Sequence, residues 1–218
     1  MRYKGFTLAE VLITLGVIGV VAAMTLPSLV ANYQKKQNVV LLKKFYTNFS
    51  AALLKAAQEE GCVGDFNCYF DAIAVTNNSN TADRVEKAYN SILKHLNATR
   101  CTNPTGTGFV TAQCADYTIN HNYDGSGTDA LFHYSFVTND GMYISYVASG
   151  SSTNGGWILV DVNGPKKPNR EGRDIFTFWI FEGNKPLSPV ARGNCTEDDK
   201  YGQSCAARII KNNWEMDY

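Results

Sequence analysis

One carboxylate, Glu10, lies near the start of an almost wholly apolar stretch that runs from Phe6 to Val30. About 20 residues of helix span roughly 30 Å, which matches the hydrocarbon core of a bilayer, so this stretch is long enough to cross a membrane. A charged carboxylate costs about 2 to 3.5 kcal/mol at the centre of a bilayer and less near its interface. We therefore expect Glu10 either to lie at the membrane interface as an ordinary polar residue or to meet a cation.

The cysteines are the second group of residues whose spacing suggests chemistry. Six cysteines fall as three local pairs, namely Cys62 with Cys68, Cys101 with Cys114, and Cys195 with Cys205. An even number of closely spaced cysteines is typical of disulfides in a protein exported to an oxidising compartment. The sequence prefers pairing between neighbours along the chain but does not fix it. No C-x-x-C motif occurs and the three histidines lack zinc-ligand spacing, so we expect no metal site from these residues.

The rest of the sequence offers no catalytic constellation. It contains neither a G-x-S-x-G nucleophile elbow nor a phosphate-binding glycine loop. Lys plus Arg and Asp plus Glu each number 20, so the overall charge does not favour a nucleic-acid partner. We expect a protein that is not an enzyme and that has no cofactor.

A single long helix is predicted to position Glu10. Beyond the apolar stretch, apolar residues continue at alternating spacings of three and four, which is the pattern of one helix face. These residues are Val39, Leu42, Tyr46, Phe49, Leu53 and Ala56. Gly61 follows where a C-terminal cap is expected, so the helix is predicted from about Phe6 to Glu60. Pro27 removes one backbone donor and is predicted to kink or loosen the first half.

Beyond Cys101 the pattern changes from helical to extended. A second helix is predicted at about Thr81 to Leu96. Weak strand patterns occur at 109–111 and 117–120, and stronger ones occur at 131–137, 142–147, 157–162 and 175–181. Thr138 to Gly141 is predicted to form the hairpin turn between the first two stronger strands. The sequence thus predicts an α+β fold in which a long N-terminal helix packs on an antiparallel sheet of about four strands.

Two ordinary explanations compete for the N-terminal stretch. A basic start, an apolar core and small residues at Ala22 and Ala23 are typical of a cleaved secretory signal peptide. Glu10 inside that core, and the helical pattern beyond any cleavage site there, oppose this explanation. A retained single-pass anchor accounts for the length but leaves Glu10 unexplained. Either explanation would make the protein an exported or membrane-anchored binding or enzymatic domain.

A third explanation comes from the residues around Glu10. The run Lys4-Gly5-Phe6-Thr7-Leu8-Ala9-Glu10, followed by about twenty apolar residues, resembles the class III signal of type IV pilins and type II secretion pseudopilins. The resemblance covers roughly the first thirty residues and is much weaker over the remainder. The loop from Asp161 to Phe178 also looks like a segment of pseudopilin globular domains, with matches at Asp161, Asn163, Gly164, Pro168, Gly172 and Asp174.

This resemblance implies how the protein is processed and assembled. A prepilin peptidase would cut between Gly5 and Phe6 on the cytoplasmic side and methylate the new amino group of Phe6. Glu10 would then be the fifth residue of the mature chain, where the family keeps its acid, and Pro27 falls where many members have a helix-loosening proline. In the family, the acid is thought to pair with the Phe6 amine of a neighbouring subunit. Such a pair would fix axial register, because a shifted neighbour leaves two buried charges unmatched.

The loop around Asp161 and Asp174 admits two interpretations. Oxygens of Asp161, Asn163 and Asp174 could bind Ca²⁺, as a comparable loop does in some major pseudopilins. A turn built by Asn163-Gly164-Pro165 with capping carboxylates is the favoured alternative, because a full set of oxygen ligands is not visible in the sequence.

We therefore predict a structural subunit, a pilin or pseudopilin, of a type IV pilus-like or type II secretion filament. Its expected parts are a leader at 1–5, a transmembrane and assembly helix at 6–30, an amphipathic helix at 31–60 and an extracytoplasmic globular domain at 61–218. The expected location is the inner membrane, with later assembly into a periplasmic or surface filament. The expected partners are prepilin peptidase, other pilin or pseudopilin subunits and an inner-membrane assembly platform.

Overall fold

The computed structural model describes residues 5, 7–65, 68–69, 87, 89–101, 134–147, 157–182, 185–191, 193–196 and 202–218. The chain divides into two compact units, Met1–Gln37 and Asn38–Tyr218. Helix α1, Leu8–Glu59, begins in the first unit and ends in the second. This element confirms the long N-terminal helix predicted from the apolar pattern.

The second unit is built on one antiparallel sheet. Its strands are β1 Ala98–Arg100, β2 Tyr134–Thr138, β3 Tyr143–Val147, β4 Trp157–Asp161, β5 Ile175–Glu182 and β6 Lys185–Pro189. Each strand pairs with the next along the chain, so the spatial order is β1-β2-β3-β4-β5-β6. The α+β, pilin-like class is confirmed.

The predicted number of about four strands is wrong, because the described residues already form a sheet of six. The two strands that the sequence did not reveal are its edges. Strand β1 has only three residues, too few for an alternating pattern. Strand β6 contains Pro186 and Pro189, which normally argue against a strand. An edge strand tolerates proline because one of its sides needs no partner for its N–H groups.

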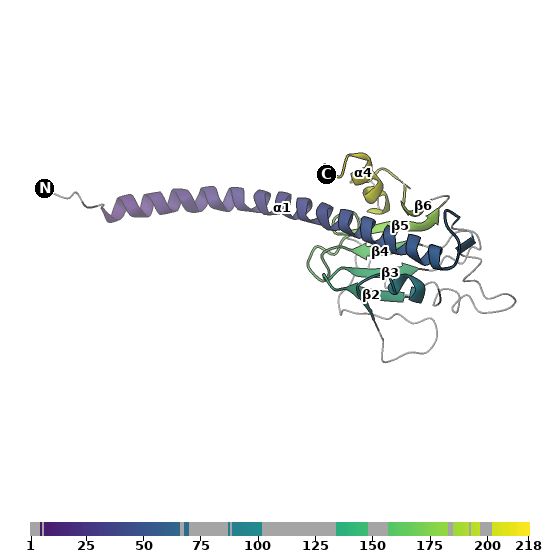
Figure 1. Cartoon of the computed structure of the whole chain (residues 1–218). Coiled ribbons are helices and arrows are strands. Elements are labelled where there is room, and N and C mark those ends of the chain that lie inside the picture. Colours follow the sequence, from purple (N-terminus) through teal and green to yellow (C-terminus); the bar gives the residue numbers. More distant parts are fainter. Residues whose placement is uncertain are drawn as a thin grey trace. The chain divides into compact units, whose positions relative to one another are not determined.

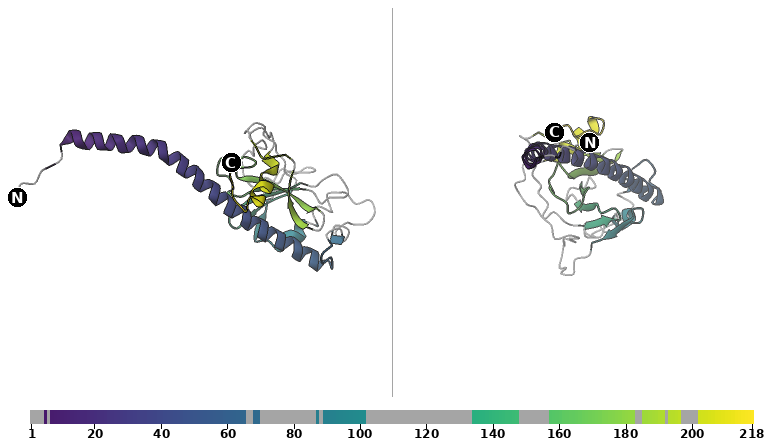
Figure 2. Two further views of the ribbon diagram at one scale, coloured as in Figure 1. Left: turned by 90° about the horizontal axis from the view of Figure 1, so that it is seen from above. Right: turned by 90° about the vertical axis from the view of Figure 1, so that its left-hand side faces the viewer.

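The second half of α1 packs on one face of this sheet (Figures 1 and 2). Phe45 meets Phe178 with ring centroids 5.6 Å apart, and Phe49 stacks on Phe136 at 6.4 Å. Strand register aligns the apolar side chains of this face, since Ile144 lies opposite both Phe136 and Val160. The predicted apolar helix face is thus the main core contact of the unit, and Phe49 and Leu53 are fully buried there.

The other face of the sheet is also buried, and it carries polar side chains such as Ser135, Ser145 and Thr177 beside apolar ones. Cys101, Tyr143, Leu159 and Ile175 form a second small cluster. An antiparallel sheet often exposes one face to water, and the strands of such a sheet then alternate between apolar and polar residues. Burial on both faces explains why the first four residues of β4, 157–160, form a continuous apolar run rather than an alternating one.

Tight turns and a short C-terminal element complete the unit. In the predicted turn between β2 and β3, the Gly141 N–H donates to the Thr138 carbonyl at 2.9 Å, and Gly141 has φ +85°. The 3-10 turn η1, Gly202–Ser204, leads into helix α4, Cys205–Lys211. Trp214, just beyond α4, meets Tyr46 of α1 edge-on at 5.7 Å.

Some predicted elements lie wholly or partly outside the described residues. These are the weak strands at 109–111 and 117–120, residues 131–133 of the strand predicted at 131–137, and residues 81–86 and 88 of the predicted second helix. Residues 89–93 of that helix are described and helical.

Candidate functional site

The carboxylate of Glu10 closes the first turn of α1. Thr7 directly precedes the helix, and both its backbone N–H and its hydroxyl donate to Glu10 Oε2 at 2.8 Å. The Glu10 N–H lies 3.3 Å from Thr7 Oγ1. This is a capping box, in which a Thr and a Glu three residues later satisfy helix-terminal donors reciprocally.

The capping box gives Glu10 a partner within its own chain. Sequence reasoning missed Thr7, although the T-x-x-E spacing at the start of an apolar run is a recognised signal for this motif. Only one carboxylate oxygen is used: among the interactions between described residues, Glu10 Oε1 accepts no hydrogen bond. Glu10 Oε1 is therefore available to accept a hydrogen bond from another donor.

The predicted cleavage position lies just before this cap. Gly5 is exposed, has no helical backbone and has open space where a Cβ would lie. Phe6 lies outside the described residues. Glycine has the lowest helix propensity after proline, so a peptide bond beside Gly5 lies in chain that a peptidase can bind in extended form.

The first half of α1 presents apolar side chains without burying them. None of its described residues before Asn38 is buried. The exposed side chains include Leu12 at 61%, Ile13 at 66%, Ile18 at 63% and Met24 at 76% of their full area. Burying one such side chain contributes about 1.5 to 3 kcal/mol, so this surface requires lipid or other protein around it.

Several uncharged polar groups interrupt the apolar surface, and two of them lie near its middle. Pro27 lies inside the helix and has no N–H, so the carbonyl of Ala23 lacks its usual partner. The Thr25 hydroxyl donates to the Val21 carbonyl at 2.9 Å. Hydroxyls of Thr that bond to the preceding turn remain satisfied in an apolar medium. Among the described residues from Leu8 to Val30, Glu10 is thus the only charged side chain.

By length and composition, α1 is the one helix in the described part of the chain that could cross a membrane. A signal sequence near an N-terminus passes the same test, and no membrane is present. Length and composition therefore do not distinguish a membrane-spanning helix from a signal sequence, and the sequence motif must decide.

A comparison with protein families supplies that class. Residues 1–26 match the family described as the prokaryotic N-terminal methylation motif. The chain therefore carries a type IV pilin-like prepilin motif, as the resemblance around Glu10 predicted. Searches of curated proteins and of solved structures give no match.

The cysteines are disulfide-bonded where the structure describes them. Cys62 and Cys68, which both follow the C-terminus of α1, are bonded to each other. Cys195 is bonded to Cys205 at the start of α4. Cys101 is also disulfide-bonded, and Cys114 lies outside the described residues. The Cys195–Cys205 bond ties the segment after β6 to the C-terminal helix.

The loop between β4 and β5 is closed by its own hydrogen bonds. The Asp174 carboxylate accepts from the N–H groups of Asn169 at 2.9 Å and Arg170 at 2.7 Å, and from Asn163 Nδ2 at 3.2 Å. Asp161 Oδ1 accepts from the Asn163 N–H at 3.2 Å. Burial raises the pKa of Asp174 above its ordinary value, although the three hydrogen bonds oppose this shift.

These contacts fit the turn that the sequence favoured at this loop. Gly164 has φ +66°, and a Cβ there would lie 2.6 Å from the Gly141 carbonyl oxygen, so both the backbone and the close approach require glycine. Within the described residues, no group of three or more His, Cys, Asp or Glu side chains is arranged to hold a metal ion. Calcium binding by Asp161, Asn163 and Asp174 stays a prediction.

Proposed function

We propose that this protein is a structural subunit, a pilin or pseudopilin, of a type IV pilus-like or type II secretion filament. Prepilin peptidase cuts it between Gly5 and Phe6 and methylates the Phe6 amine, and the subunit then polymerises through its N-terminal helix. The observation that carries this proposal is the methylation motif at residues 1–26, continuous with an apolar helix that its own chain leaves uncovered.

The uncovered apolar surface of the helix suits both the membrane-inserted subunit and the assembled filament. Before assembly the helix lies in the inner membrane, where lipid covers it. After assembly, helices of neighbouring subunits replace the lipid, so the same side chains stay out of water at each stage. The proposal assigns no catalytic residue and no cofactor, and names as partners the peptidase, other subunits and an inner-membrane assembly platform.

The capping box explains how Glu10 can serve before and after assembly. In a single chain Oε2 is bonded to Thr7, which lowers the cost of keeping the carboxylate at the membrane edge. In the filament, Oε1 pairs with the amine of Phe6 in a neighbouring subunit, and the cap need not break. A neighbour in the wrong register leaves both charges unpaired in an apolar core, at a cost of several kcal/mol.

Three substitutions separate the cap from the charge. Glu10→Gln keeps an oxygen for Thr7 and removes the charge, Glu10→Ala removes both, and Thr7→Ala weakens the cap but keeps the charge. We expect all three variants to insert in the membrane, as checked by resistance to alkaline extraction. We expect Thr7→Ala to form filaments and both Glu10 variants to lose them, as scored by electron microscopy of sheared fractions. Normal filaments from Glu10→Gln would contradict the proposed role of the charge.

A further inference from the structure

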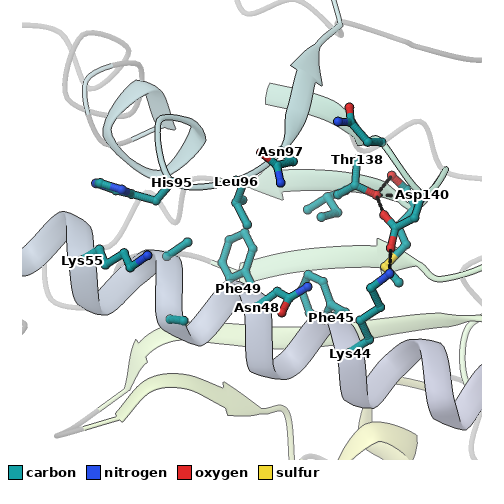
Figure 3. A pocket seen from close by; sticks show the side chains of 15 residues that line it. Lys44, Phe45, Asn48, Phe49, Lys55, His95, Leu96, Asn97, Thr138 and Asp140 are labelled. Atoms are coloured by element: carbon teal, nitrogen blue, oxygen red, sulfur yellow. Dashed lines mark hydrogen bonds and ion pairs between the residues drawn. The ribbon is translucent and has the colours of Figure 1, made fainter.

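A cavity of about 390 Å³ lies within the second unit, where the second half of α1 faces the turn between β2 and β3 (Figure 3). Residues 95–97, just before β1, form its third side. Small-molecule sites typically enclose about 300 to 1,000 Å³, so this cavity is large enough for a small organic ligand.

The inner wall of the cavity is apolar and rigid. Phe49, Met142 and Ile144 line it and are buried, with at most 2% of their area exposed. Phe49 is fixed by ring contacts on both sides, to Phe45 at 5.2 Å and to Phe136 at 6.4 Å. Such a wall offers a preformed surface to an aromatic or aliphatic group.

The charged side chains at the two ends of the cavity have partners that keep them from a ligand. At one end Lys44 Nζ lies 2.7 Å from Asp140 Oδ2, and the Thr138 hydroxyl also bonds to Asp140, so this cation is neutralised. At the other end, His95 turns its Nε2 to Glu59 Oε2 at 3.3 Å, away from Phe49. Glu59 does not line the cavity and is already paired with Lys94 at 2.8 Å.

Lys55 is the one lysine of the lining that makes no ion pair with a described residue. Figure 3 shows its side chain, and the amides of Asn48 and Asn97, turned toward the space around the Phe49 ring. The side chains of Lys55, Asn48 and Asn97 make no hydrogen bond with other described residues. One ammonium and two amide groups thus surround an apolar wall, and no unpaired carboxylate lines the cavity.

We propose that this cavity is a binding site for a small organic monocarboxylate with an apolar body. The carboxylate of the ligand accepts a charge-assisted hydrogen bond from Lys55 and further hydrogen bonds from the amide groups of Asn48 and Asn97. The apolar body lies against Phe49, Leu96 and Met142. An inorganic anion lacks the group that this wall would bury, and an organic cation is repelled by Lys55 without finding an unpaired acid.

The test uses the full chain in lipid nanodiscs and phenylacetate as the probe. Binding is followed by ligand-observed NMR, with empty nanodiscs as the blank that subtracts partition into lipid. We expect saturable binding of phenylacetate, weaker binding of neutral phenylacetamide, and none of phenethylamine. Lys55→Met keeps an unbranched side chain that is one atom shorter and removes the charge, and should weaken phenylacetate binding about tenfold.

A matched variant controls for loss of charge as such. Lys211→Met removes an exposed lysine of α4 that does not line the cavity, and should bind phenylacetate as the unsubstituted protein does. Lack of saturable phenylacetate binding would overturn the proposal. So would equal binding of phenethylamine, or a Lys55→Met protein that binds phenylacetate with unchanged affinity. None of these outcomes depends on filament assembly.

Discussion

Truncation of Phe49 tests whether the second half of α1 is the spine of the globular unit. Phe49 is 1% exposed and lies between the rings of Phe45 and Phe136. Phe49→Ala therefore removes the side chain that joins the helix to β2. The substitution leaves a good helix former in place, so its effect comes from packing.

The expected loss follows from where Phe49 lies. Replacing a buried Phe by Ala costs about 3 to 5 kcal/mol, part of which comes from the empty space left behind. The Phe49 ring also lines the cavity beside α1, so the vacated space joins an existing cavity that water can enter. This reduces the cavity contribution, and we expect about 3 kcal/mol, at the lower end of the range.

Urea unfolding of the full chain in detergent micelles, followed by tryptophan fluorescence, measures this loss. Leu54→Ala is the matched control, because Leu54 lies on the same helix with 49% of its area exposed. The control should change the free energy of unfolding by no more than about 0.5 kcal/mol. A Phe49→Ala loss below about 1 kcal/mol, or an equal loss in both variants, would refute the packing argument.

Two further predictions concern the globular unit. Burial raises the pKa of Asp174, so the folded state holds this proton more tightly, and the free energy of unfolding should fall as the pH rises from 3.8 through the folded pKa. Asp174→Asn should abolish this part of the pH dependence in urea titrations at several pH values, and an unchanged slope would contradict the assignment. Replacing Cys195 and Cys205 together by Ser should lower the free energy of unfolding by about 3 kcal/mol, because the bond closes a short loop. Reduction of the unsubstituted protein also breaks the Cys62–Cys68 bond and the bond made by Cys101, so it should lower the free energy of unfolding by at least as much. A double variant as stable as the oxidised protein would exclude this role.

Much of the fold could be predicted because its signals are local. The apolar spacing from Val39 to Ala56 indicated the helix face that packs on the sheet, and the residues at Thr138 to Gly141 indicated a turn. Strand β6 could not be predicted, because Pro186 and Pro189 oppose local strand propensity. Its pairing with β5, with Leu187 opposite Ile180, comes from tertiary contact.

The candidate site was predicted only in part. Glu10 stands out in the sequence because an acid is unusual in an apolar run, and Gly5 was assigned through the motif that surrounds Glu10. The Thr7 partner was overlooked although its spacing to Glu10 carries the signal. The cavity beside Lys55 could not be predicted, because its walls come from three segments that are distant in the sequence.

The cleaved N-terminus is the most direct test of the central claim, that this chain is a processed filament subunit. Protein purified from membranes of cells with an active prepilin peptidase is digested, and its first peptide is sequenced by tandem mass spectrometry. Cells that lack the peptidase provide the control, in which Gly5 stays joined to Phe6. The account predicts that the mature chain begins with N-methyl-Phe6. A mature chain that begins near Met24, after the apolar core, would contradict it.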